Sequence, residues 1–222
     1  MYLKWNEQTI ADFSDDNIDS LYNEGYVFTR VGKGIMNQTR SVRIDLNKFE
    51  LSSENRRILR KTEELKLQIE KIPYRNYSWE IGKLAKDFYE TKFGDGTFSA
   101  NKVRELLTEK RDDFNRVLCY DTPNKVKDDN AVGYCIAVET ENILHYSYPF
   151  YNLNSKINNL GMGMMIRAVQ YAKDTGKQYI YLGSFQRPTD IYKLQFAGLQ
   201  WFDGEGWKQD VEKLKRLNTK NT

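Results

Sequence analysis

The segment from residue 144 to residue 196 constrains the fold more than any other part of the chain. It begins within the apolar, aromatic-rich run Ile143–Tyr151, which predicts a β-strand. Residues 158–163 contain two glycines and lead into apolar positions with helical spacing, and a second strand is expected at residues 179–182. A helix that begins after such a loop directs backbone N–H groups toward the loop. This arrangement suits a phosphate or another electron-rich acyl carrier.

The rest of the chain carries helix and strand signals in a mixed order. Helices are expected before residue 23, at 56–64, 78–92 and 101–111, near 190–196, and in the basic tail. Strands are expected as two short segments within 26–49, and at 65–72, 115–120, 131–139 and 199–202, with a polar turn at 122–130. Antiparallel strands beside helices, followed by a strand–helix–strand crossover, predict a mixed α/β layer.

Composition sets the limits on class and location. A chain of 222 residues with 40% hydrophobic content can bury one substantial core. No apolar run approaches the roughly 20 residues that span a bilayer, and the N-terminus lacks the order of a signal peptide. Cys119 and Cys135 lie in separate strand-like segments without CxxC spacing, which predicts buried, reduced thiols. We therefore expect a cytoplasmic protein with no membrane partner.

Positive charge is unevenly distributed along the chain. The net charge of +3 is too small to establish a nucleic-acid partner, yet Arg56, Arg57, Arg60 and Lys61 form a cluster. Such a cluster is typical of a solvated helix face and also of a surface that contacts phosphates. Both interpretations stay open for this helix, and no DNA partner is expected.

Several short motifs occur in a characteristic order. Residues 39–62 read TRSVRIDLNKFELSSENRRILRKT, and residues 150–183 contain FYN, NLG, IRAVQYA and YLG in turn. This series resembles the catalytic half of the arginyl- and leucyl-tRNA–protein transferases, which is itself similar to the GNAT acyltransferase superfamily. The resemblance covers most of residues 25–202, and no single motif within it is as specific as their order.

The resemblance implies an α/β (α+β) protein with a GNAT-like acyltransferase fold, in which helices flank a mixed, mostly antiparallel sheet. We expect residues 1–72 to form an N-terminal segment that packs on a main domain at 73–222. The implied enzyme transfers arginine or leucine from aminoacyl-tRNA to the N-terminal α-amine of proteins that begin with Asp or Glu, in the N-degron pathway. It needs no cofactor. An acetyl-coenzyme A-dependent N-acetyltransferase and a non-catalytic descendant that binds tRNA or peptides are the alternatives.

The chain departs from the patterns of the family and of the GNAT superfamily at several places. Residues 32–38 contain no cysteine where the family has a cysteine cluster, so no metal site is expected. Asp190 and Ile191 replace a lysine and a methionine. Asn158 stands where a coenzyme A loop usually has glutamine or arginine.

The chemistry of aminoacyl transfer guides the choice of donor-binding residues. The tRNA ester is already activated and an α-amine has a pKa of about 8, so positioning should supply most of the rate. The candidates for donor binding are Asn159, Leu160, Gly161, Met162, Gly163 and Arg167. Alternatively, the two glycines only serve a tight turn, and Arg167 is an exposed helix residue.

Catalytic and acceptor-side candidates come from other segments. Tyr192 can hand a proton to the leaving ribose oxygen, and Lys193 can hold a phosphate or carboxylate; the alternative is a solvated lysine beside a core tyrosine. His145 is expected to pack in a strand. The candidates for acceptor or tRNA binding are Arg56, Arg57, Arg60, Tyr148 and Tyr181, although the two tyrosines also suit a core or cleft wall.

Overall fold

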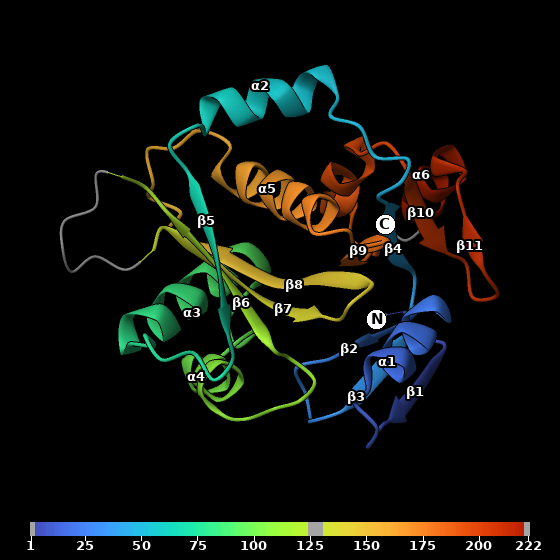
Figure 1. Ribbon diagram of the computed structural model, residues 1–222, viewed down its shortest axis with the longest axis horizontal. Coiled ribbons are helices and arrows are strands. Elements are labelled where there is room, and N and C mark those ends of the chain that lie inside the picture. Colours follow the sequence, from blue (N-terminus) through green and yellow to red (C-terminus); the bar gives the residue numbers. More distant parts are fainter. Residues whose placement is uncertain (1–2, 124–130, 220–222) are drawn as a thin grey trace. The chain divides into compact units, whose positions relative to one another are not determined.

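The computed structural model describes residues 3–123 and 131–219 (Figure 1). The chain divides into two compact units, neither of which is continuous in sequence. The first unit contains residues 1–52, 139–145 and 172–222, and the second contains residues 53–138 and 146–171. Strand β8 (Ile143–Tyr151) and helix α5 (Leu160–Asp174) each contribute residues to both units. Most of the predicted turn at 122–130 lies outside the described residues.

The described residues of the first unit form short strands and helical segments. Its strands are β1 (Asn6–Thr9), β2 (Tyr26–Phe28), β3 (Ile35–Gln38), β4 (Ser41–Asp45), β9 (Tyr179–Ser184), β10 (Leu199–Phe202) and β11 (Trp207–Lys208). Its helices are α1 (Asp15–Asn23), the 3₁₀ helix η1 (Pro188–Gln195) and α6 (Val211–Thr219).

Two sheets organise these strands. Strands β1, β3 and β2 form an antiparallel sheet in that order. In the other sheet the order is β11, β10, β4 and β9, again antiparallel, and the start of β8 then pairs with β9 in parallel, from Ile143↔Tyr179 to His145↔Tyr181. Parallel neighbours need a crossover connection, which α5 supplies. The predicted strand–helix–strand crossover is confirmed.

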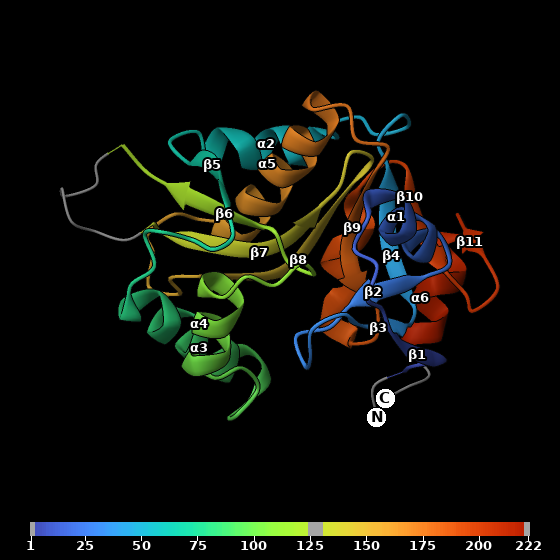
Figure 2. The ribbon, with the colours of Figure 1, turned by 60° about the horizontal axis from the view of Figure 1, so that its bottom comes forward.

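The second unit combines an antiparallel sheet with helices. Its elements are α2 (Ser53–Lys61), β5 (Lys66–Lys71), α3 (Trp79–Phe93), α4 (Ala100–Thr108), β6 (Arg116–Asp121), β7 (Gly133–Glu139) and the larger parts of β8 and α5. The strand order is β5, β6, β7, β8, and β6 is antiparallel to both of its neighbours. Helices α3 and α4 lie side by side, and α2 lies along α5 (Figures 1 and 2).

Local sequence accounts for these elements. In α3, Ile81, Ala85, Phe88 and Tyr89 are buried on one face, as their helical spacing predicts. The side chain of Ser99 accepts a hydrogen bond from the backbone N–H of Lys102 and thereby caps α4. Helix α1 ends where Gly25 adopts a φ of 82°.

The α+β class with a mixed, mostly antiparallel sheet is confirmed, with corrections to individual elements. Strands β1 and β11 were not anticipated, and residues 26–49 hold three strands instead of two. Helix α2 starts three residues earlier than expected, and the helix near residue 190 is a 3₁₀ helix. Cys119 and Cys135 are buried free thiols, as predicted. Within residues 3–123 and 131–219, no helix is long and apolar enough to cross a membrane.

Candidate functional site

The predicted donor-binding loop leads into the first turn of α5, in the second unit. The left-handed position is Asn159, with a φ of 64°, and neither Gly161 nor Gly163 has a positive φ. The N–H of Gly163 donates to the carbonyl of Asn159 at 2.8 Å, so this predicted donor-binding amide is already engaged within the helix. The amides that precede it in the helix, those of Leu160 and Gly161, have no intrahelical acceptor by geometry.

Close packing explains both glycines. A Cβ atom added to Gly161 would lie 2.8 Å from ring atoms of Tyr151, and one added to Gly163 would lie 2.7 Å from Oγ1 of Thr62. The glycines therefore allow a strand residue and the end of α2 to approach the first turn of α5. The interpretation of these glycines as a tight turn alone is wrong. Their presence is explained without a ligand, so the donor site rests on the helix start and on the family resemblance.

Arg167 lies one helical turn further along α5 and contacts the end of α2. Its Nη2 donates to the carbonyl of Thr62, and its Nε is buried without a partner in the described part of the chain. Burial lowers the pKa of the Arg167 guanidinium, and the nearby hydroxyl of Tyr120 opposes that shift. The alternative of an exposed helix arginine is wrong, because Arg167 is half-buried.

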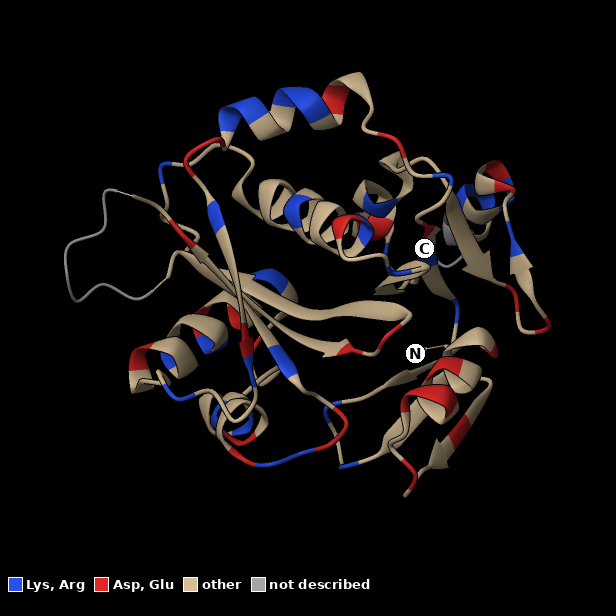
Figure 3. Ribbon diagram, in the orientation of Figure 1, with Lys and Arg blue, Asp and Glu red and all other residues tan. Residues whose placement is uncertain are grey.

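Helix α2 carries the predicted arginine cluster (Figure 3). Arg57 binds Glu54 through two nitrogens, with Nε 2.6 Å from Oε2, and this bond raises the pKa of Arg57 and lowers that of Glu54. Arg56 and Arg60 are exposed and share one side of the helix at i, i+4 spacing. The second unit therefore places the start of α5 beside a basic helix, with Arg57 already engaged.

Tyr148 occupies an aromatic cluster of the second unit. Its ring centroid lies 5.5 Å from that of Phe98 and 5.7 Å from that of Phe114. Edge and tilted contacts of this kind stabilise a core. They support the core interpretation of this tyrosine over direct acceptor binding.

Tyr192 and Lys193 lie on η1, in the first unit. Tyr192 is 39% exposed, whereas Lys193 is only 6% exposed. The Lys193 ammonium donates to the carbonyl of Ser184 at 2.6 Å and lies 3.6 Å from Asp190. The alternative of a solvated lysine beside a core tyrosine is wrong, because Lys193 is the buried residue of the two and Tyr192 is partly exposed. Burial lowers the pKa of Lys193, and Asp190 opposes that shift.

Lys193 therefore ties η1 to the end of β9. An ammonium that already has a carbonyl and a carboxylate nearby has little capacity to hold a substrate phosphate. Asp190, which replaces the family's lysine, also accepts hydrogen bonds from the backbone N–H groups of Gln186 and Arg187, both at 2.9 Å. The departure at position 190 is thus part of this internal network.

His145 is buried in the first unit, as the sequence led us to expect. Its Nδ1 lies 2.9 Å from the hydroxyl of Tyr22. Burial, together with the charge of Lys193, lowers the pKa of His145 to about 3. The imidazole is therefore neutral near pH 7.

Tyr181 is fully buried and is held by Arg43, a residue that sequence reasoning did not single out. Nη1 of Arg43 donates to the Tyr181 hydroxyl at 3.0 Å and to Asn23 at 2.7 Å, and Nε donates to Gln200 at 2.8 Å. The guanidinium also lies 3.8 Å and 3.9 Å from the ring centroids of Tyr179 and Trp207. Burial raises the pKa of Tyr181 to about 12. Tyr181 is thus a core residue.

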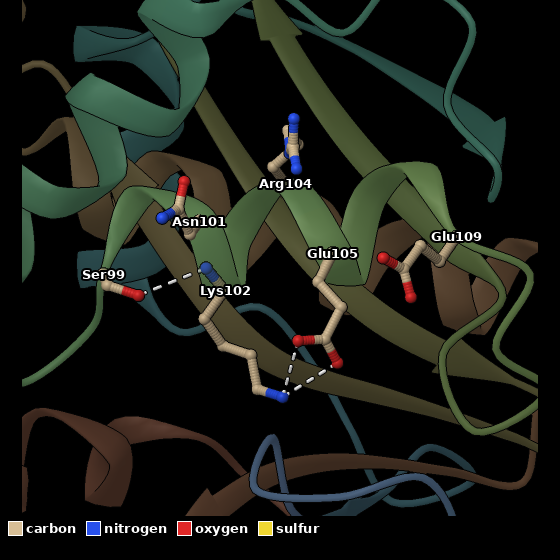
Figure 4. A pocket seen from close by; sticks show the side chains of 6 residues that line it. All are labelled: Ser99, Asn101, Lys102, Arg104, Glu105 and Glu109. Atoms are coloured by element: carbon tan, nitrogen blue, oxygen red, sulfur yellow. Dashed lines mark hydrogen bonds and ion pairs between the residues drawn. The ribbon is translucent and has the colours of Figure 1, made fainter.

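A shallow hollow of about 570 Å³ lies along α4 (Figure 4). Its lining residues are Ser99, Asn101, Lys102, Arg104, Glu105 and Glu109. Lys102 and Glu105 pair at 2.8 Å, so these charges largely neutralise each other. None of the predicted site residues lines this hollow.

Comparison with known proteins identifies relatives of the chain. An aspartate/glutamate leucyltransferase from Dinoroseobacter shibae is 24% identical over 216 residues, which cover 89% of this chain and 74% of that protein. A second, from Ruegeria pomeroyi, is 25% identical over 173 residues, covering 76% and 61% of the two chains. A third, from a Ruegeria species, is 28% identical over 129 residues, covering 56% and 46%. The chain is a homologue of the aspartate/glutamate leucyltransferases.

This relationship confirms the resemblance to the arginyl- and leucyl-transferase family that the motifs predicted. The chain spans only part of each relative, and no protein-family model matches it. Among solved structures, the L-PGS from Bacillus licheniformis is 12% identical with a TM-score of 0.47, covering 76% of this chain and 51% of that one. FemX is 10% identical with a TM-score of 0.45, covering 77% and 60%. The fold class follows from the topology of this chain itself.

Proposed function

We propose that the chain transfers an aminoacyl group, first of all leucyl, from tRNA to the α-amine of proteins that begin with Asp or Glu. The observation that carries this proposal is the shared name of three curated relatives, each 24–28% identical to the chain. Their name specifies a leucyl donor and supports leucine over arginine. The chain would then be an acyltransferase that needs no cofactor.

The reaction is the aminolysis of an ester. The neutral α-amine attacks the carbonyl carbon of the aminoacyl ester, a C–N bond forms, and the bond from that carbon to the ribose oxygen breaks. The amine loses a proton and the ribose oxygen gains one. Because the amine has a pKa of about 8, no strong base is required, and positioning of the two reactants supplies most of the rate.

Donor binding is assigned to the second unit. The N–H groups of Leu160 and Gly161 at the start of α5 suit a phosphate or a developing oxyanion. Arg56 and Arg60 are exposed on α2, and arginines at such positions suit the phosphates of the tRNA. Arg57 is paired with Glu54. Arg167 supports this region from within, because it joins α5 to the end of α2.

The proton transfer is assigned to Tyr192. Tyr192 is 39% exposed, whereas Tyr181 is fully buried. Lys193 acts as a positioning residue, since its ammonium fixes η1 through the carbonyl of Ser184. Changing Tyr192 to Phe should therefore reduce the rate of transfer more than the binding of either substrate.

Incubation with labelled leucyl-tRNA and arginyl-tRNA tests the proposal directly. Peptides that begin with Asp, Glu or Lys serve as acceptors, and we expect label from leucyl-tRNA on the first two only. Transfer from arginyl-tRNA instead would change the donor but keep the reaction class. Absence of transfer from both tRNAs, together with heat protection by acetyl-coenzyme A, would overturn the proposal in favour of an acetyltransferase.

A further inference from the structure

Arg40, in the first unit, is a half-buried arginine with two nitrogens that no described residue pairs. It lies in the two-residue connection between β3 and β4. Its Nε and Nη1 are buried and have no hydrogen-bond partner in the described part of the chain. Burial is the cause of its lowered pKa, and no charged neighbour contributes to that shift. Leaving the donors of a charged group buried and unpaired costs free energy, so the position requires an explanation.

Arg43 shows how the same unit treats a structural arginine. Three residues along the chain, its guanidinium donates to Gln200, Asn23 and Tyr181 and lies between two aromatic rings. Among the residues that the structure describes, Arg40 has no such set of partners. The contrast within one short segment indicates that Arg40, unlike Arg43, does not stabilise the free protein.

The backbone around Arg40 is nevertheless firmly held. Its carbonyl accepts a hydrogen bond from the N–H of Phe185 at 2.7 Å, and the adjacent Ser41 pairs with Ser184 at the end of β9. On the other side, the hydroxyl of Thr39 accepts a hydrogen bond from Gln186 at 2.6 Å. A firmly held backbone around Arg40 reduces the further ordering that the binding of a ligand requires.

The ligand must be a small anionic group whose oxygens accept hydrogen bonds from the planar guanidinium. A guanidinium matches a carboxylate with two parallel hydrogen bonds. The phosphates of a nucleic-acid backbone are instead bound by several exposed cations in a row, whereas Arg40 is one half-buried cation. The observations therefore favour a carboxylate over a nucleic-acid phosphate.

We propose that Arg40 binds the side-chain carboxylate of the acidic first residue of the acceptor. This inference rests on the proposed function, since it takes the acidic acceptor from there. Arg40 then determines acceptor specificity without taking part in the bond changes. An acceptor that begins with Asn or Gln offers one neutral amide oxygen in place of the carboxylate and binds less tightly.

Peptide binding tests the inference independently of transfer. Peptides labelled at their C-terminus and beginning with Asp, Glu, Asn or Gln are titrated against the full chain, and fluorescence anisotropy gives each Kd. We expect the peptides that begin with Asp or Glu to bind about 10- to 100-fold more tightly than those that begin with Asn or Gln. Arg40→Met should abolish this ratio and leave the affinity for the amide peptides unchanged, while Arg40→Lys should retain part of it.

Two controls separate a ligand site from a structural one. Arg216→Gln removes one positive charge from an exposed position on α6, in the same unit, and should keep the ratio. Without peptide, the variant Arg40→Met should unfold at the same temperature as the unchanged protein or at a higher one, because the unpaired donors are removed. A lower unfolding temperature, or an equal loss of affinity for all four peptides, would overturn the inference.

The remaining outcomes also decide between explanations. Weaker tRNA binding by Arg40→Met, with peptide binding unchanged, would make phosphate the ligand and overturn the inference. The inference would also be overturned if the unchanged protein bound the Asp and Glu peptides no more tightly than the Asn and Gln peptides. Acidic selectivity that depends on Arg40, in a protein that transfers from no tRNA, would support the inference and reject the transferase. Transfer with selectivity that survives Arg40→Met would support the transferase and reject the inference.

Discussion

In the first unit, some side chains stabilise the fold, whereas the positions of others are not accounted for by a contribution to stability. Arg43 and His145 are buried and have defined partners, whereas Tyr192 is partly exposed and two nitrogens of Arg40 have no partner among residues 3–123 and 131–219. The first pair should govern the free energy of unfolding. The second pair should govern substrate binding and rate.

Replacing Arg43 should destabilise the protein. Arg43→Met removes three hydrogen bonds and leaves buried acceptors on Gln200 and Tyr181. We expect a loss of about 2 to 4 kcal/mol in the free energy of unfolding, measured by urea denaturation. Arg216→Gln, which removes the same charge from an exposed helix, should change it by less than about 0.5 kcal/mol. Equal stability of both variants would contradict the structural role of Arg43.

His145 should make the protein sensitive to acid. Its pKa falls from an ordinary value near 6.5 to about 3 in the folded chain, so the folded state disfavours the proton. The stabilisation is fully present above pH 6.5 and is lost as the pH falls toward 3. Between pH 7 and 4.5 the linkage amounts to about 2 to 3 kcal/mol.

The variant His145→Gln has no group that titrates in this range. The free energy of unfolding should therefore depend less on pH for the variant than for the unchanged protein. Equilibrium urea denaturation at pH 7 and pH 4.5 measures the difference between the two proteins. An identical pH dependence would show that His145 is not buried in its neutral form.

Among the elements, the pair α2 and α5 is the one most relevant to the donor site. Thr62 and Arg167 join the end of α2 to α5, and Gly163 permits their close approach. The sequence identified both helices, because their apolar spacing and flanking residues are local signals. It did not identify why the glycines are needed. That reason lies in contacts with Tyr151 and Thr62, residues distant in sequence.

The contact between the helices can be tested with a double-mutant cycle. Gly163→Ala places a Cβ against Thr62 and should cost about 1 to 3 kcal/mol of unfolding free energy. Thr62→Ala removes both atoms nearest to that Cβ, so the double variant should be more stable than the sum of the two single effects predicts. Additive effects would show that the two residues do not contact each other.

The basic face of α2 should show itself in the salt dependence of tRNA binding. Arg60→Ala should weaken binding of uncharged tRNA and reduce the slope of log K against log salt by about 0.7 to 0.9 for each phosphate that the variant no longer neutralises. Arg57→Ala should have a smaller effect, because Arg57 is paired with Glu54. Titrations at several salt concentrations measure both slopes. An equal reduction for the two variants would contradict this difference in availability.

At the scale of the whole molecule, the sequence predicted the kinds of element better than their assembly. Ile143–Tyr151 was located to the residue, because a long apolar strand followed by a turn is a local pattern. The two-residue strand β11 gave no such pattern, and Arg40 and Arg43 look alike in the sequence. Only their partners, or the lack of them, distinguish the two arginines. Those partners come from segments far along the chain.

The interleaved segments of the two units have a consequence for synthesis. Once residue 171 has left the ribosome, every residue of the second unit is available, and that unit can begin to form on the nascent chain. The first unit still lacks β9, β10 and β11, and its earliest segment has to wait for them. A pause late in translation would therefore expose residues 1–52 to chaperones and proteases before their partner strands emerge.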